Sequence, residues 1–93
     1  MPDAVCVSEV RFTPAPERLL PTGLIGWASF SLDSRFKVAG VSVRRTRSGR
    51  RVLSYPVRDD GVGLRWELLK PLDDETRRAV EEQVLAMIPE VSR

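Results

Sequence analysis

The sequence predicts a single α+β domain, with an antiparallel meander sheet of about five strands and a C-terminal helix packed on it. Residues 4–69 are divided by Pro, Gly and Asp-Ser turn signals into short stretches rich in Val, Phe and Leu, which is typical of strands. After Pro71 the apolar residues recur with helical spacing. Since 93 residues are too few to build two cores, we expect one domain that spans residues 1–93.

The first two strands are expected over residues 4–13 and 22–32. In the first strand the apolar positions change phase near Ser8 and Glu9, which indicates an irregularity there. The segment between the strands is predicted to be a loop without regular structure, because it contains Pro14, Pro16 and Pro21. The second strand alternates, and the apolar residues that share one of its faces are Leu24, Ala28, Phe30 and Leu32.

Two hairpins are expected to follow. Asp33 and Ser34 favour a tight turn into the third strand, whose apolar pattern slips at Ala39 and Gly40, as a β-bulge would make it do. The tip of the next hairpin is expected over residues 46–49, with a positive φ at Ser48 or Gly49. The third, fourth and fifth strands are expected over residues 35–45, 50–55 and 64–69.

The helix is predicted to begin after Asp73, a favourable N-cap residue, and to end at Pro89. Asp74 and Glu75 in the first turn complement the helix dipole. The apolar stripe expected to face the sheet consists of Val80, Val84, Ile88 and, less squarely, Met87. The charged residues expected to face outward are Arg77, Arg78, Glu81 and Glu82.

The charge along the chain is strongly uneven. The segment from Arg35 to Arg58 carries eight positive charges and no negative charge, whereas residues 1–34 sum to −2 (two bases against four acids) and residues 59–92 to −5 (four bases against nine acids). Seven of the eight bases are Arg, whose planar fork suits phosphate better than Lys does. A field of one sign attracts polyanions such as nucleic acid. The eight bases are Arg35, Lys37, Arg44, Arg45, Arg47, Arg50, Arg51 and Arg58.

Most of these arginines would lie on one predicted hairpin, where like charges opposite one another reduce stability. Three explanations are open. The side chains could bind the phosphates of nucleic acid, they could keep the hairpin in solution and prevent edge pairing, or the acidic helix or a neighbouring subunit could neutralise them. We adopt the first as the working hypothesis. The hairpin arginines are Arg44, Arg45, Arg47, Arg50 and Arg51.

The chain lacks most of the residues on which catalytic and metal sites depend. There is no histidine and only one cysteine, Cys6, which argues against zinc, haem and nucleophile–histidine sites, and no glycine-rich phosphate loop is present. We therefore expect no enzyme, no cofactor and no small-molecule substrate. Cys6 is predicted to be a small buried hydrophobe. Trp27, Tyr55 and Trp66 could stack on unpaired bases, or could belong to the core or a dimer interface.

The expected location is cytoplasmic. No apolar stretch approaches the roughly 20 residues that span a bilayer, so no membrane partner is expected. A single cysteine cannot form an internal disulfide, which agrees with a reducing compartment. Since a domain of this size has a small stability margin, association into a homodimer is plausible.

Several segments, in this order, resemble the SpoVG proteins, small bacterial regulators of sporulation and septation. They are VSEVR (residues 7–11), ASFSLDSRFKV (28–38), VSV (41–43), LSYP (53–56) and PLDDETR (71–77). The resemblance covers residues 7–88 and implies a dimeric domain of antiparallel strands and a C-terminal helix that binds DNA, and in some members RNA, without a cofactor. Arg58 and Arg77 match basic positions of the family, whereas Val57 and Trp66 stand where the family has bases.

The prediction is a non-enzymatic nucleic-acid-binding regulator, a cytoplasmic dimer that contacts phosphates through its arginine-rich hairpin. Because the hairpin has more arginine than the family leads us to expect, either the binding surface has moved there or the affinity differs, and we place the binding surface at the hairpin. The alternative is a protein-interaction module, linked to cell division and septation, that docks an acidic partner. The predicted binding residues are Arg44, Arg45, Arg47, Arg50, Arg51, Arg58 and Arg77.

Overall fold

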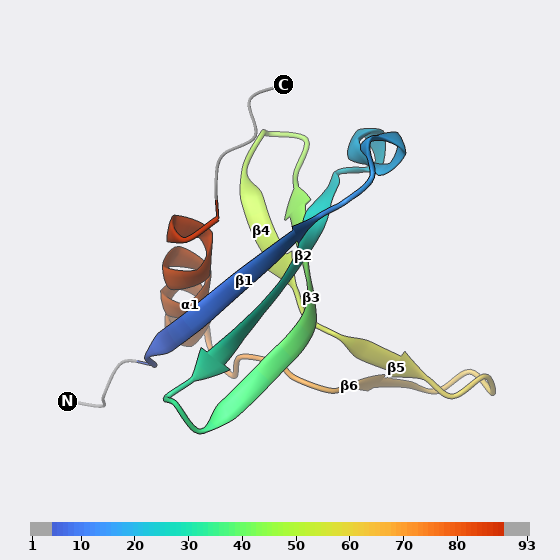
Figure 1. The fold of residues 1–93 in the computed structure, drawn as a ribbon. Helices are drawn as coiled ribbons and strands as arrows, with labels where there is room; N and C mark the ends of the chain where they lie inside the picture. Colours follow the sequence, from blue (N-terminus) through green and yellow to red (C-terminus); the bar gives the residue numbers. More distant parts are fainter. Residues whose placement is uncertain (1–4, 89–93) are drawn as a thin grey trace.

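The computed structural model, which describes residues 5–88, shows the α+β fold that the sequence predicts (Figure 1). Four antiparallel strands form the main sheet in the order β1-β2-β3-β4, so each strand pairs with its neighbours in the chain. Helix α1 (Asp74–Ala86) covers one face of this sheet. The strands are β1 (Val7–Pro14), β2 (Leu24–Leu32), β3 (Phe36–Arg45) and β4 (Arg51–Ser54).

Strand β1 contains the predicted irregularity and is held by the helix. Glu9 has a positive φ of 53°, and the register with β2 shifts between Ser8 and Arg11. The side-chain amide of Gln83 on α1 accepts from the backbone N–H of Val7 (2.9 Å) and donates to the carbonyl of Val5 (2.6 Å). One polar side chain therefore satisfies two backbone groups at the start of the sheet.

The proline-rich segment is not the irregular loop that was expected. Residues Glu17–Thr22 form a short 3₁₀ helix, η1, with Pro21 inside it. The prediction was wrong because a 3₁₀ turn of this length uses few backbone donors, so a proline near its end removes no necessary hydrogen bond. Gly23 ends η1 at a φ of 93° and donates from its N–H to the carbonyl of Leu20 (3.0 Å).

Both predicted hairpins of the main sheet are confirmed. Asp33 and Ser34 have positive φ values of 52° and 55° in the turn between β2 and β3. The register between these strands shifts at Ala39 and Gly40 of β3, and Gly40 has a φ of 75°. This bulge restores the phase of the strand, so that the apolar residues on both sides of it are buried. They are Val38, Val41 and Val43.

The expected fifth strand does not join the main sheet. It pairs with a short strand that follows Pro56, and the two form a separate two-stranded ribbon that projects from the body (Figure 1). Proline lacks the N–H that would continue the β4 ladder, and the Asp60 carboxylate closes the ribbon's loop by accepting from the N–H groups of Val62 (3.0 Å) and Leu64 (3.2 Å). The strands are β5 (Val57–Asp59) and β6 (Arg65–Glu67).

The hydrophobic core lies between the main sheet and α1. Its most deeply buried large side chains are Phe30, Val41, Val43 and Val84. The helix stripe is confirmed for Val80, Val84 and Ile88, whereas Met87 is 68% exposed. Cys6 was expected to be buried and is exposed, because its neighbours Val5 and Val7 both pack against the core and the side chain between them faces away from it. None of the helices in residues 5–88 is long and apolar enough to cross a membrane.

Candidate nucleic-acid interface

The hairpin between β3 and β4 presents most of the predicted binding residues at one end of the main sheet. We call residues 44–51 the arginine hairpin. Its tip is closed by hydrogen bonds from Thr46 N–H to the Arg50 carbonyl (2.8 Å) and from Gly49 N–H to the Thr46 carbonyl (2.9 Å). In Figure 1 this tip lies at the opposite end of the sheet from the turn between β2 and β3. The exposed arginines of the hairpin are Arg44, Arg45, Arg47 and Arg50.

The strand register distributes these arginines over both faces of the hairpin. Val43 and Leu53 pair with each other and are buried in the core. Because side chains alternate along a strand, Arg45 and Arg51, which also pair, lie on the same face beyond the core, whereas Arg44 lies on the opposite face. The hairpin therefore offers guanidinium groups on both of its sides and at its tip.

Arg51 is part of the fold rather than of the exposed surface. Its side chain is half-buried, and its guanidinium donates to the carbonyl oxygens of Leu85 (3.3 Å) and Ile88 (3.3 Å) at the end of α1. The Leu85 carbonyl also accepts from the backbone N–H of Ile88 (3.2 Å), so the guanidinium adds a second donor to it, and a cation suits the negative end of the helix dipole. Arg51 thus attaches the hairpin to the helix end.

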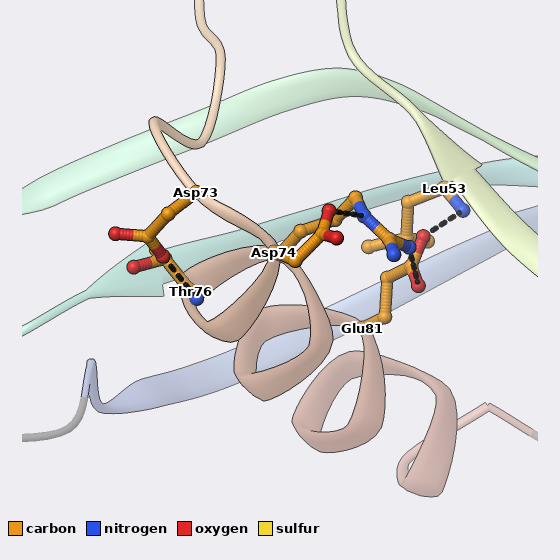
Figure 2. Close-up of polar contacts among 6 residues, drawn as sticks. Leu53, Asp73, Asp74, Thr76 and Glu81 are labelled. Atoms are coloured by element: carbon orange, nitrogen blue, oxygen red, sulfur yellow. Dashed lines mark hydrogen bonds and ion pairs between the residues drawn. The ribbon is translucent and has the colours of Figure 1, made fainter.

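Arg77 is also engaged within the molecule. Its Nη1 lies 3.0 Å from Oε1 of Glu81, and its Nε lies 3.5 Å from Oδ1 of Asp74. Figure 2 shows the side chains of Asp74 and Glu81, which lie about two turns apart on α1, projecting toward this contact. A phosphate at this position would have to compete with two carboxylates that are already in place.

Glu81 is the residue that the helical pattern misplaced. It was expected to face outward, yet it is buried, with 6% of its surface exposed. Its second oxygen, Oε2, accepts a hydrogen bond from the backbone N–H of Leu53 on β4 (3.2 Å; Figure 2). The prediction failed because β4 leaves this N–H pointing at the helix, and a buried donor requires an acceptor.

The start of α1 follows its predicted capping pattern. The Asp73 side chain accepts a hydrogen bond from the backbone N–H of Thr76 (2.7 Å), as Figure 2 shows. The hydrogen bonds from the backbone and the side chain of Thr76 lower the pKa of Asp73 below its usual value. A carboxylate in this role satisfies one free N–H of the helix start, which fixes where the helix begins.

Arg58 lies apart from the arginine hairpin. It is exposed on strand β5 of the ribbon, where its cross-strand partner is Trp66. The fold therefore brings the exposed hairpin arginines together, and it separates them from Arg58 and from Arg77.

One basic residue near the hairpin was not among the predicted binding residues. A hollow of about 230 Å³ lies where the hairpin meets α1, and Arg78 lines it together with Arg50 and Arg51. Glu81 and Glu82 line the same hollow, so the charge of its lining is mixed. Only the packing of the helix beside the hairpin shows that Arg78 extends the basic surface.

The three aromatic residues that were considered for base stacking have different environments. Tyr55 is half-buried against the core, and burial, followed by the charge of Glu81, raises its pKa to about 12, while Arg77 opposes this shift. Trp27 is half-buried on the sheet face away from the helix, since its neighbour Ala28 lies in the core. Trp66 is 55% exposed on the ribbon. None of the three belongs to the arginine hairpin.

No protein-family model matches this chain, and no curated protein matches it. The resemblance to the SpoVG proteins therefore remains a prediction from sequence motifs.

Proposed function

We propose that the protein is a non-enzymatic, nucleic-acid-binding regulator that contacts phosphates through the arginine hairpin. The observation that supports this function is that three exposed arginines at the hairpin end of the sheet have no carboxylate partner among residues 5–88. Arginines at such a density repel one another, and a phosphate backbone would relieve this repulsion by supplying acceptors for their forked donors. The hairpin arginines without a carboxylate partner among residues 5–88 are Arg44, Arg47 and Arg50.

The acidic helix compensates only part of this surface: Glu81 and Glu82 line the hollow beside Arg50. Two of its acids, Asp74 and Glu81, contact Arg77. Glu81 also accepts a hydrogen bond from the β4 backbone. The competing explanation, in which the helix neutralises the hairpin, is therefore weakened. A role limited to preventing edge pairing does not account for arginines at the tip, where no strand edge is exposed.

The exposed hairpin residues have the main role in this proposal. Arg44, Arg47 and Arg50 would bind phosphates, with Arg45 beside them. Arg51 and Arg77 would act indirectly, because they hold the hairpin and the helix in place. Contacts of this kind fix position on a backbone without reading the bases, so DNA and RNA are both expected to bind, with little sequence preference. We place the regulator in the cytoplasm and expect it to act as a dimer.

Fluorescence anisotropy with labelled single-stranded DNA, duplex DNA and RNA at low salt tests this function. The double variant Arg47→Glu/Arg50→Glu is expected to bind every probe at least about tenfold more weakly, since each reversal replaces attraction to phosphate by repulsion. Arg35→Glu is the matched control, because it reverses an exposed arginine beside the turn at the other end of the sheet.

Two results would overturn the proposal: no binding of any probe at low salt, or an equal loss of affinity in the Arg35 control. A protein partner that remains bound to the wild type after nuclease treatment, and that the hairpin variant loses, would instead support docking of an acidic protein.

A further inference from the structure

The ribbon formed by β5 and β6 is amphipathic, and its apolar face is exposed. Leu64, Trp66 and Leu68, in β6 and directly beside it, alternate and therefore share a face, and they are 54%, 55% and 59% exposed. Arg58, the cross-strand partner of Trp66, lies on the same face, whereas the opposite face has the cross-strand pairs Asp59–Arg65 and Val57–Glu67. In an antiparallel ribbon with one apolar face, that face normally packs against another layer.

No such layer is supplied by the rest of the described chain. The two strands pair only with each other. Hydrogen bonds from the N–H of Asp60 to the carbonyl of Leu64 (3.1 Å) and from the N–H of Leu68 to the carbonyl of Pro56 (3.1 Å) extend this ladder at its ends. A lone two-stranded ribbon is at best marginally stable in water. The ribbon nevertheless extends away from the main sheet in Figure 1, so additional burial is needed to stabilise it.

The apolar surface continues from the ribbon into a groove at its base. The groove has a volume of about 420 Å³, and Leu68 of the ribbon and Phe36 at the start of β3 both line it. Phe36 is 72% exposed, although its neighbour two residues along, Val38, is buried. The rest of the lining is apolar except for one base, and consists of Leu32, Lys37, Val38, Ala39, Pro56 and Leu69. One molecule thus has both a projecting apolar face and an apolar hollow.

The charges around the ribbon favour a second copy of this chain over a polyanion or an acidic protein. Residues 57–70 contain three bases and three acids, so this segment has no net charge. Lys70 already lies 3.6 Å from Glu67, and the remaining bases and acids can meet one another across a two-fold axis. The bases are Arg58, Arg65 and Lys70, and the acids are Asp59, Asp60 and Glu67.

The available area also fits a dimer. The large apolar side chains of the ribbon face, the ribbon loop and the groove together offer on the order of 500 Å² of surface, at about 100 Å² each. Polar residues at the margin would supply the rest of the roughly 800 Å² that each partner of a stable complex buries. The side chains counted are Phe36, Val62, Leu64, Trp66 and Leu68.

We propose that two copies of the chain associate through this surface, with the apolar face of each ribbon packed into the groove of the other. The contact is reciprocal, as two-fold symmetry requires. This surface would form the dimer that the proposed function assumes, and the association does not depend on nucleic-acid binding. The dimer would also carry two arginine hairpins, which would strengthen binding to one polyanion through avidity.

Light scattering coupled to size-exclusion chromatography, without nucleic acid, tests this interface. The wild type is expected to have the mass of a dimer, and Trp66→Ser and Phe36→Ser are each expected to have the mass of a monomer at the same concentration. The two substitutions lie on the ribbon and on the main sheet, so the groove is tested even if the ribbon variant does not fold. Leu72→Ser is the matched control, because Leu72 is 95% exposed outside the ribbon and the groove lining.

A second readout follows the ribbon directly. In a Trp27→Phe background, the fluorescence of Trp66 is expected to shift to the blue as the protein concentration rises, because association removes the indole from water. A wild type that is a monomer at every concentration, or variants that dimerise as the wild type does, would overturn the proposal. The Arg47→Glu/Arg50→Glu variant is expected to remain a dimer, so failure of the interface and failure of nucleic-acid binding are separate results.

Discussion

Glu81 is the residue that joins the helix to the edge of the sheet. One oxygen accepts from the β4 backbone at Leu53 (3.2 Å), and the other lies 3.0 Å from the Arg77 guanidinium. A buried carboxylate is tolerated only where such partners replace the water that it loses. The arrangement is therefore asymmetric: with all partners present it is stable, and the loss of one leaves a buried polar group unsatisfied.

The first prediction concerns the removal of this carboxylate. Glu81→Ala is expected to lower the free energy of unfolding by about 3 kcal/mol, because the Leu53 N–H then has no acceptor and the half-buried Arg77 loses an ion pair. Urea unfolding followed by circular dichroism measures this change. The control is Glu82→Ala on the exposed side of the helix, which is expected to change stability by less than about 0.5 kcal/mol. Equal effects of the two substitutions would contradict this role for Glu81.

At the scale of elements, the contact between β1 and β2 depends on a residue without a side chain. Gly26 is buried in β2 opposite Pro14. A Cβ atom there would lie 2.6 Å from Cε1 and 2.7 Å from Cζ of Phe12, and would also meet the carbonyl oxygen of Thr13. The Phe12 ring therefore occupies the space that a side chain would need, which lets β1 cross β2 closely.

The second prediction follows from this close approach. Gly26→Ala is expected to destabilise the protein by about 2 kcal/mol, because the added methyl group overlaps both the Phe12 ring and backbone atoms, and the backbone must move to relieve the overlap. Thermal unfolding measures the change. Ser29→Ala, on the half-buried opposite face of the same strand, serves as the control and is expected to be nearly neutral. A stability equal to that of the wild type would contradict this role of Gly26, because it would mean that β1 can move away from β2 without loss of stability.

The bulges illustrate how an element keeps its phase. The bulge at Ala39 and Gly40 inserts one residue into β3 and so returns Val41 to the buried face. The same kind of shift in β1 occurs at Glu9, where φ is 53°. In both strands the change of apolar phase in the sequence predicted the position of the irregularity.

At the scale of the whole molecule, the uneven charge of the chain becomes uneven charge in space. The chain has a net charge of only +2, yet the exposed arginines of the hairpin lie together at one end of the sheet. Carboxylates lie on α1 and in the ribbon, and three of them, Glu67, Asp74 and Glu81, already form ion pairs. The hairpin end therefore attracts anions locally, although the molecule is nearly neutral overall.

The third prediction concerns the salt dependence of binding. If the hairpin arginines Arg44, Arg47 and Arg50 each neutralise one phosphate of duplex DNA, log K is expected to fall against log salt concentration with a slope of about −2.7 per protomer. Arg44→Ser is expected to reduce the size of this slope by about 1, whereas Arg35→Ser leaves it unchanged. Anisotropy titrations across a series of salt concentrations measure these slopes. Binding that does not change with salt would exclude phosphate contact as its basis.

The candidate site was predictable in part. The exposed tip residues Arg47 and Arg50 were recognised from sequence because a hairpin turn must face solvent. The engagement of Arg51 and Arg77 was not visible, because their partners are 34 residues or more away or depend on which side of the helix is buried. The contribution of Arg78 was missed for the same reason: it requires the helix to pack beside the hairpin.

The sequence by itself determined the α+β class, the strands of the main sheet with their bulges and tight turns, and the cap of the helix. These features depend on local physics: side-chain alternation, positive φ values, the geometry of proline and a capping carboxylate. Only the tertiary structure decided that the fifth strand leaves the main sheet, that Glu81 is buried, and that an apolar ribbon is exposed. Each of these depends on which backbone donors and apolar surfaces meet across long separations in the chain, and local spacing contains no record of that.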